Sequence, residues 1–359
     1  MMVERVTYKR SFYWVFLMCC LLIPGIISTF TWSERIREDI AFNISGIITL
    51  CVCAAYFYKR LIGFENLMKI ISYFLLPVIS LGFVLFFLTP EIEDINFTAN
   101  ANFATSGGFG PNQVATVLGM GWLIILIFLL YRQKLTPFIM VTIILFAFIL
   151  YRSLFTFSRG GNFTSILALV GFICVHFFYK KSTIISLRSF TLIMLACIVS
   201  YSVVIYLDTV TEGIFGNRFT GKNTAGEQKE DITTGRMATF EEEWQLFVAN
   251  PMGVGVGGSR AFRTEEFGDT KATHNEFGRL LSEHGVFGAV IIFMLYYIPL
   301  SLFFKMKLTD SKAFLVLFMI IALGTMMHSA MRIALPAFFY GLALSVIIPL
   351  NYETHLHRQ

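Results

Sequence analysis

Long runs of apolar residues are the feature of this sequence that most limits its fold. A helix that crosses a bilayer needs about 20 mostly apolar residues, and ten stretches of this chain meet or nearly meet that length. Only 14% of the residues are charged, whereas about a quarter are charged in a soluble protein. We therefore predict an all-α polytopic membrane protein with about ten transmembrane helices, at residues 11–32, 40–58, 68–89, 112–131, 135–151, 163–179, 187–207, 286–304, 313–331 and 333–350.

The positions of lysine and arginine predict the orientation of these helices, because cytoplasmic loops are enriched in both. With a cytoplasmic N-terminus, the six cytoplasmic pieces hold 15 of the 28 basic residues, and the four short outer loops hold five. We therefore expect both termini in the cytoplasm. The basic residues are scattered between apolar runs and form no single patch, so we expect no nucleic-acid partner.

One long polar segment, residues 208–285, divides the chain. It follows seven predicted helices in residues 1–207 and precedes three more, with a cytoplasmic tail, in residues 286–359. Long loops cross the membrane largely regardless of their charge. We therefore expect this segment to be one large, partly helical loop on the outer side, and we expect the functional residues there.

Two motifs in this loop predict local structure. Met237, Phe240, Trp244 and Phe247 recur at helical spacing, which predicts an amphipathic helix on the outer surface that ends at Asn250-Pro251. The glycine-rich run NPMGVGVGGSR that follows completes no phosphate-loop pattern, and no strand precedes it. We interpret this run as a flexible turn.

Arg159 lies in a short outer loop, where a positive charge opposes the orientation rule. An arginine fork binds phosphate oxygens in bidentate fashion, and the following Gly160 and Gly161 would let the backbone approach a bound anion. The alternative is an arginine that snorkels to the lipid headgroups beside a glycine turn. Arg152 and Arg332 are weaker candidates of the same kind.

Two more arginines in the long loop are candidates for binding an anion. Arg236 opens the predicted amphipathic helix, where the helix dipole disfavours a cation by about 0.3 to 1 kcal/mol. Arg218, in GNRFTG, is the second candidate. Each could instead be a solvated arginine that pairs with a neighbouring glutamate.

His274 is the candidate catalytic residue, because an imidazole can take up or release a proton near neutral pH. It lies directly before a predicted membrane helix and is followed by Asn275 and Glu276, which could support it. Glu276 and Glu283 are rival bases, and His274 could simply hydrogen-bond a turn. No Cys, His or carboxylate cluster in the outer loops has metal-ligand spacing, so we expect no metal and no cofactor.

Four motifs together give a resemblance to a known family. They are GPNQVA, SRGG, GRMATFEEEWQLFVANPMGVGVGG and THNEFGRLLSEHGVFG. In this order and spacing, over about residues 107 to 300, the chain resembles the bacterial O-antigen ligase and O-antigen polymerase family. The resemblance implies a metal-independent, inverting glycosyltransferase of the inner membrane whose active site is periplasmic and whose donor is an undecaprenyl-diphosphate-linked glycan.

The resemblance also implies roles for individual residues. Arg159 and Arg236 match arginines that bind the donor pyrophosphate, Arg218 matches less clearly, and His274 matches the histidine proposed to activate the acceptor hydroxyl. We expect a polymerase of O-antigen or another surface polysaccharide, a preference that rests on chain length alone. The expected partners are this donor, a glycan or lipid A core acceptor, and membrane lipids. Whether a partner protein sets the chain length is left open.

Three alternatives to a polymerase remain. The first is an O-antigen ligase that transfers glycan to the lipid A core. The second is a lipid-linked glycan flippase or transporter, which should have polar residues along a path through the membrane. The third is a peptidoglycan polymerase, for which Asp231 or Asp269 would have to supply a catalytic carboxylate in the outer loop.

Overall fold

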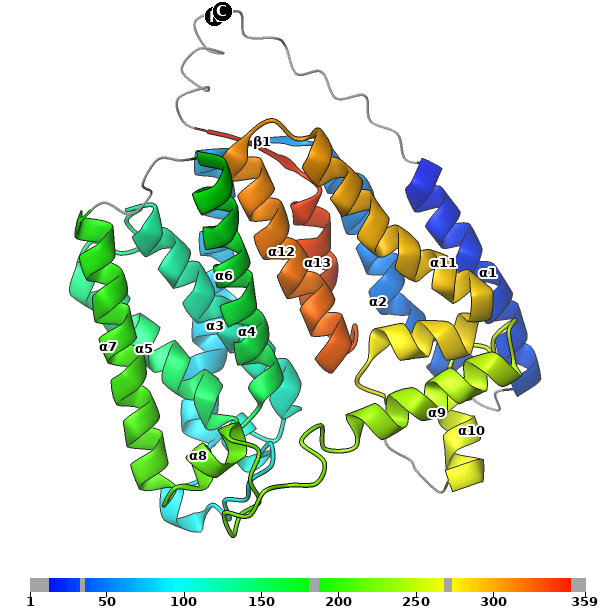
Figure 1. Cartoon of the computed structure of the whole chain (residues 1–359), viewed down its shortest axis with the longest axis horizontal. Coiled ribbons are helices and arrows are strands. Elements are labelled where there is room, and N and C mark those ends of the chain that lie inside the picture. The colour runs from blue at the N-terminus through cyan, green and yellow to red at the C-terminus, as the bar shows by residue number, and fades with distance from the viewer. Residues whose placement is uncertain (1–12, 33–35, 181–186, 268–272, 350–359) are drawn as a thin grey trace, which may run out of the picture. The chain divides into compact units, whose positions relative to one another are not determined.

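The computed structural model describes residues 13–32, 36–180, 187–267 and 273–349 (Figure 1). Within these ranges nearly all regular structure is α-helical, which confirms the predicted fold class. The chain forms two compact units. Residues 64–235 form one, which we call the central unit, and residues 1–63 together with 236–359 form the other, which we call the terminal unit.

The central unit is a helical bundle built around α4. Nearly all residues of α4 are buried, and it packs against α3, α5, α6 and α7. α6 approaches α4 closely because Gly161 has no side chain, and a Cβ there would lie 2.5 Å from the backbone of Ala115 and Thr116. The elements are α3 (Phe64–Leu88), η1 (Ile92–Asp94), η2 (Ala104–Ser106), α4 (Pro111–Leu130), α5 (Ile139–Phe155), α6 (Arg159–Lys180), α7 (Leu187–Val210) and α8 (Ile214–Phe219).

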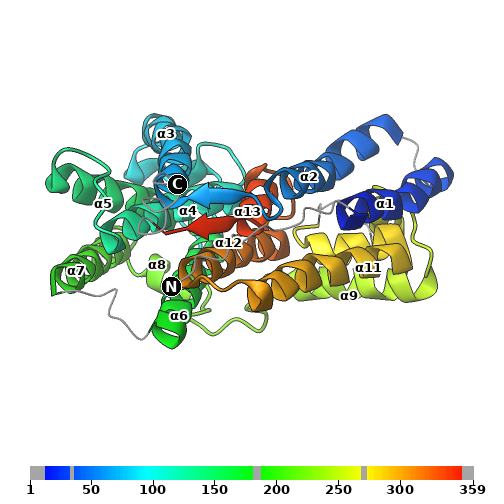
Figure 2. The ribbon, with the colours of Figure 1, turned by 90° about the horizontal axis from the view of Figure 1, so that it is seen from above.

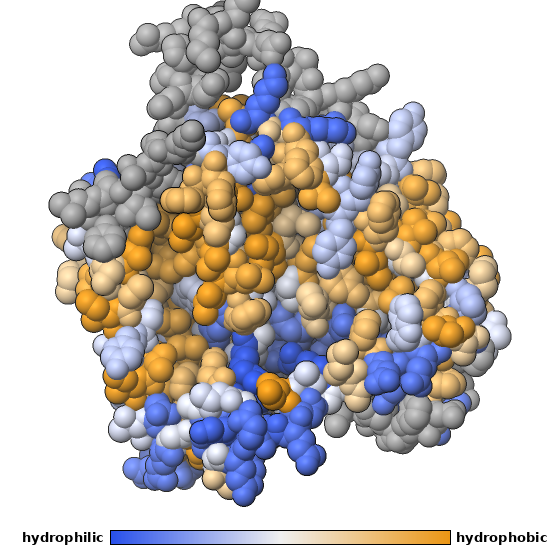
Figure 3. Space-filling view, in the orientation of Figure 1, coloured by the Kyte–Doolittle hydropathy of each residue, from blue (hydrophilic) through white to orange (hydrophobic). Residues whose placement is uncertain are grey.

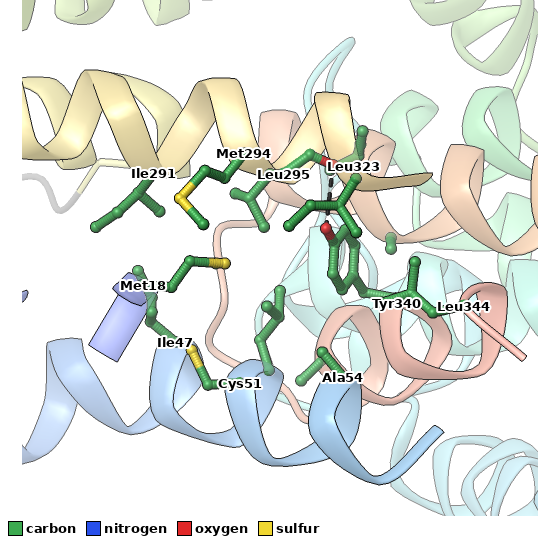
Figure 4. Close-up of a cluster of buried hydrophobic side chains, with 14 of the residues drawn as sticks. Met18, Ile47, Cys51, Ala54, Ile291, Met294, Leu295, Leu323, Tyr340 and Leu344 are labelled. Atoms are coloured by element: carbon green, nitrogen blue, oxygen red, sulfur yellow. Dashed lines mark hydrogen bonds between the residues drawn. The ribbon is translucent and has the colours of Figure 1, made fainter. Parts of the chain in front are cut away.

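The terminal unit packs both ends of the described chain around one apolar core. Figure 4 shows Met18, Cys51 and Met294 in this core, where the Tyr340 hydroxyl donates a hydrogen bond to the Leu295 carbonyl at 3.2 Å. Dense packing holds such a core, because lipid tails are as apolar as its side chains. The elements are α1 (Tyr13–Trp32), α2 (Ile36–Phe57), β1 (Leu61–Gly63), α9 (Arg236–Ala249), α10 (Gly258–Phe267), α11 (Glu276–Lys305), α12 (Thr309–His328), α13 (Leu335–Ala343) and β2 (Val346–Ile348).

Eight helices in the described ranges are long and apolar enough to cross a membrane, which makes the chain a multi-pass membrane protein. A ninth apolar helix, α5, has 17 residues. The prediction of a spanning helix at residues 333–350 is wrong. The helix there, α13, has nine residues, and the chain then forms β2, which pairs in parallel with β1 (Figure 2).

A helix is present where the amphipathic helix was predicted, as α9, which ends at Ala249 directly before Asn250-Pro251. Its buried face differs from the apolar stripe in the sequence. Met237 and Trp244 are exposed, while Glu243 and Leu246 are buried on a helix that packs against α11. A carboxylate therefore occupies the inner face of α9.

The glycine-rich turn after α9 is packed into the terminal unit, so its interpretation as flexible is wrong. Gly253, Gly255 and Gly257 have φ angles between 81° and 85°, which a side chain would make costly. The turn reaches α11 where Gly285 interrupts the helical backbone with φ 58° and ψ −136°. There the Val286 amide donates to the Pro251 carbonyl at 2.8 Å.

Candidate active site

Two of the predicted arginines lie in the central unit, together with a lysine. Arg159 is the first residue of α6, and its Nη2 donates to the Ile232 carbonyl at 2.5 Å. Arg218 on α8 is buried and donates to the carbonyls of Phe157 and Ala99 at 3.1 and 3.3 Å. Figure 3 shows hydrophilic residues gathered over α8 and the segment that follows it.

Lys229 completes this group, which we call the central cations. Its Nζ donates to the Ala99 carbonyl at 2.7 Å and to the Asn100 side chain at 3.1 Å. Burial, followed by the positive charges of Arg218 and Arg159, lowers the pKa of Lys229. Three cations that repel one another favour a bound anion, because an anion would relieve their repulsion.

His274 lies in the terminal unit, and the backbone around it is held by several hydrogen bonds. Asn275 caps α11, since its Oδ1 accepts from the Phe277 amide at 3.0 Å. The His274 carbonyl accepts from the Ala330 amide at 3.0 Å, and Arg332 donates to the Thr273 carbonyl at 2.6 Å. The loop after α12 thus fixes the backbone, while the His274 side chain lies at the surface.

The surroundings of His274 keep its imidazole uncharged. Partial desolvation by the surrounding protein, followed by the positive charges of Arg332, Arg236 and Arg263, lowers its pKa to about 4. The imidazole is therefore neutral at pH 7 and able to accept a proton. An anion bound by these arginines would offset their charge and raise the pKa of His274, which would make it a stronger base.

Glu276 and Glu283, the rival bases, are both buried and bonded within the protein. Glu276 forms an ion pair with Arg279 and accepts from the Met331 amide at 3.1 Å. Glu283 accepts from the Gly257 amide at 3.0 Å. These bonds hold the start of α11 against the glycine-rich turn and the loop after α12. Among these three residues, only His274 has an exposed side chain.

Glu243 is a buried carboxyl group that the sequence analysis missed. Its side chain extends from α9 to the start of α11, where a Cβ at Gly278 would collide with the Glu243 Oε2 atom. Burial raises its pKa to about 7, although the charges of Arg263 and Arg279 act in the opposite direction. The three consecutive glutamates at 241–243 gave no signal that one of them faces inward.

The remaining candidates have other surroundings. Arg152 is buried and donates to the Leu85 and Thr105 carbonyls and to Thr89, so it fastens α5 to neighbouring segments. Gly161 is used in the packing of α6 on α4. Asp231 is exposed and accepts from Thr233 and Gly235, and Asp269 lies outside the described residues.

The structure thus brings Arg159 and Arg218 together with Lys229, and it brings Arg236 together with His274, Arg263 and Arg332. A comparison with known families gives one match that covers these residues, except Arg332. Residues 144–293 match the family model described as O-Antigen ligase. This match confirms the family resemblance. A search of curated proteins gives no match to the chain.

Proposed function

We propose that this multi-pass membrane protein polymerises a surface polysaccharide. The premise is that residues 144–293 match the O-antigen ligase family model, which supports membership in the O-antigen ligase and polymerase family. It acts in the bacterial inner membrane with both termini in the cytoplasm and its active site on the periplasmic side. The donor is a glycan on undecaprenyl diphosphate, and the acceptor is a second glycan. The transfer inverts the anomeric centre and needs no metal ion.

The observation that carries this proposal is the uncharged His274 among three arginines. A general base must be unprotonated and reachable, and His274 is neutral at pH 7 with its side chain at the surface. An acceptor hydroxyl gives its proton to His274 as its oxygen forms a bond to the anomeric carbon. The bond from that carbon to the diphosphate oxygen breaks, and the oxygen keeps the electron pair.

The cations serve the departing diphosphate. Its negative charge increases as the glycosidic bond breaks, so positive groups stabilise the transition state more than the ground state. We assign Arg159, Arg218 and Arg236 to this role, as the family resemblance implies, and Lys229 lies with Arg159 and Arg218 in the central unit. Gly160 and Gly161 support Arg159, and Asn275 and Glu276 support His274 by fixing the backbone around it.

Transfer to the lipid A core is the second candidate function, because the matched family is described as O-Antigen ligase. A flippase without glycosyl transfer is the candidate from another class. Purified protein with undecaprenyl-diphosphate-linked repeat units separates the three. A ladder of lengths identifies a polymerase, product on the lipid A core identifies a ligase, and translocation without a new bond identifies a flippase.

The residue assignment is tested with single variants in the same assay. We expect His274→Ala to lower the rate by roughly 10²- to 10⁴-fold, the usual worth of a general base, and we expect Arg159→Ala and Arg236→Ala to abolish product. Lys222→Ala and Arg37→Ala are controls at exposed cations to which no role is assigned. Product formation should also survive a metal chelator. Normal product from all three site variants, recovered folded, would refute the assignment.

A further inference from the structure

A charged cavity of about 250 Å³ lies in the terminal unit and is lined by residues in the N-terminal parts of α2, α10 and α11. Its lining is polar and comes from segments distant in sequence. Four arginines and three carboxylates line it, together with the side chains of Asn43, Ser259 and Thr273. Arg263 and Arg332, whose charges lower the pKa of His274, belong to this lining, but no role assigned above explains the space that the lining encloses.

The charges at the base of the cavity are buried, and those at its mouth are exposed. Arg263 is 1% exposed, Arg279 5% and Glu283 3%, whereas Glu38 and Arg260 are exposed. Removing charges from water costs several kcal/mol per ion. If these charges served only to pair with one another, their side chains would pack together and leave no cavity. The open space between the buried charges is therefore better explained by a polar ligand that fills it.

The mixture of charges indicates which class of molecule fits. The lining residues Glu38, Asp39 and Glu283 accept hydrogen bonds, and the arginines donate them. An apolar lipid chain in this space would remove charged groups from water, which is costly, and a diphosphate would meet the three carboxylates. A sugar suits the lining because each hydroxyl both donates and accepts.

The size of the cavity limits the guest to one small ring. A volume of about 250 Å³ corresponds to about eight water molecules. It lies below the roughly 300 to 1,000 Å³ of typical ligand pockets. One pyranose ring fits such a space, whereas an oligosaccharide would have to extend out of the cavity past Glu38 and Arg260.

The cavity adjoins the candidate base. Thr273, which directly precedes His274, is part of its lining, and so is Arg332, which donates to the Thr273 carbonyl at 2.6 Å. We propose that the cavity is a saccharide subsite that holds one sugar ring of the acceptor beside His274. The acceptor role rests on the proposed function, whereas the binding of a sugar ring does not.

Sugar binding is measured on the purified full-length protein by saturation-transfer NMR, in a detergent without a sugar head group and without donor. The probes are methyl glycosides of glucose, galactose and N-acetylglucosamine, with inorganic diphosphate as a competitor. We expect saturation transfer to at least one glycoside. We expect Arg260→Gln and Glu38→Gln at the mouth to weaken it at least threefold, and diphosphate to leave it unchanged.

Matched controls use the same substitutions on exposed residues that do not line the cavity. They are Arg37→Gln on α2 and Glu265→Gln on α10, and both should bind the glycosides as the unaltered protein does. Equal binding in all four variants would overturn the proposal, and so would the absence of glycoside binding. Displacement of the glycoside by diphosphate would overturn it as well, because it would identify an anion site.

These experiments test the saccharide subsite and the proposed glycosyl transfer separately, so either one can be refuted without the other. Glycoside binding that the two mouth variants weaken, in a protein that forms no product with any lipid-linked donor, would refute the glycosyl transfer and keep the subsite. Product formation whose KM for the acceptor is unchanged in Arg260→Gln and Glu38→Gln would refute the subsite and keep the transfer.

Discussion

Replacing Glu243 by glutamine tests whether the carboxyl group on the inner face of α9 carries an energetic cost. Glutamine has nearly the same shape as glutamate and cannot ionise. Glu243 is fully buried, and burial is the largest of the effects that together raise its pKa from 4.5 to about 7. The native protein therefore holds a proton on this group at pH values where the unfolded chain has released it.

The size and sign of the effect follow from this difference. One pKa unit corresponds to about 1.36 kcal/mol, so ionising Glu243 in the native state costs about 3 kcal/mol. Between pH 4.5 and 7 the native state binds more protons than the unfolded state, so stability falls as the pH rises through this window. The cost is about 1 kcal/mol at pH 5 and about 3 kcal/mol at pH 8.

Thermal unfolding of the two proteins in detergent, at pH 5 and at pH 8, measures this cost. We expect the Tm of Glu243→Gln relative to the unaltered protein to be several degrees higher at pH 8 than at pH 5. Any penalty for burying the amide is the same at both pH values and cancels in this comparison. Glu241→Gln, on the exposed face of the same helix, is the control and should show no such change.

Two results would refute the reasoning. The first is a Tm difference between Glu243→Gln and the unaltered protein that is equal at pH 5 and pH 8. The second is a larger advantage of glutamine at pH 5, which would mean that the ionised carboxylate stabilises the fold through Arg263 and Arg279.

Three further substitutions test other parts of the structure. Arg332→Gln removes a nearby positive charge, so the pKa of His274 should rise from about 4 in an NMR titration, and an unchanged value would contradict the electrostatic account. Asn275→Ala removes the cap on the Phe277 amide and should lower the unfolding free energy by about 1 kcal/mol, whereas Asn275→Asp should keep it in the same denaturation experiment. Gly161→Ala places a Cβ 2.5 Å from the backbone of α4, so thermal unfolding should show a loss of about 1 to 3 kcal/mol, and an unchanged Tm would show that the two helices can separate at little cost.

The membrane helices and α9 could be predicted because their signals are local. Length and hydropathy identify a helix that can cross a membrane, and helical spacing identified α9 with its end at Ala249. The same approach failed at residues 333–350, because composition does not show where a backbone finds hydrogen-bond partners. There the Val346 amide donates to the Arg60 carbonyl, almost 300 residues earlier in the chain.

The arginines show what sequence reasoning about a site leaves open. Arg152 and Arg159 were candidates for the same reason, a positive charge in a loop that the sequence analysis predicts to lie on the outer side of the membrane. The Arg152 side chain donates hydrogen bonds to the Leu85 and Thr105 carbonyls, which are distant from it in sequence. Arg159 instead lies with Arg218 and Lys229. Lys229 itself carried no motif, so only its surroundings indicate its role.

By itself, the sequence determined the membrane-spanning character of the chain and the family whose model residues 144–293 match. These follow from residue type, spacing and order along the chain. Tertiary structure alone decided that Glu243 faces inward, that Glu276 and Glu283 are occupied by backbone amides, and that charged residues from α2, α10 and α11 enclose a cavity. Burial, pKa and hydrogen bonding depend on neighbours that folding brings from distant segments, and local sequence does not encode those neighbours.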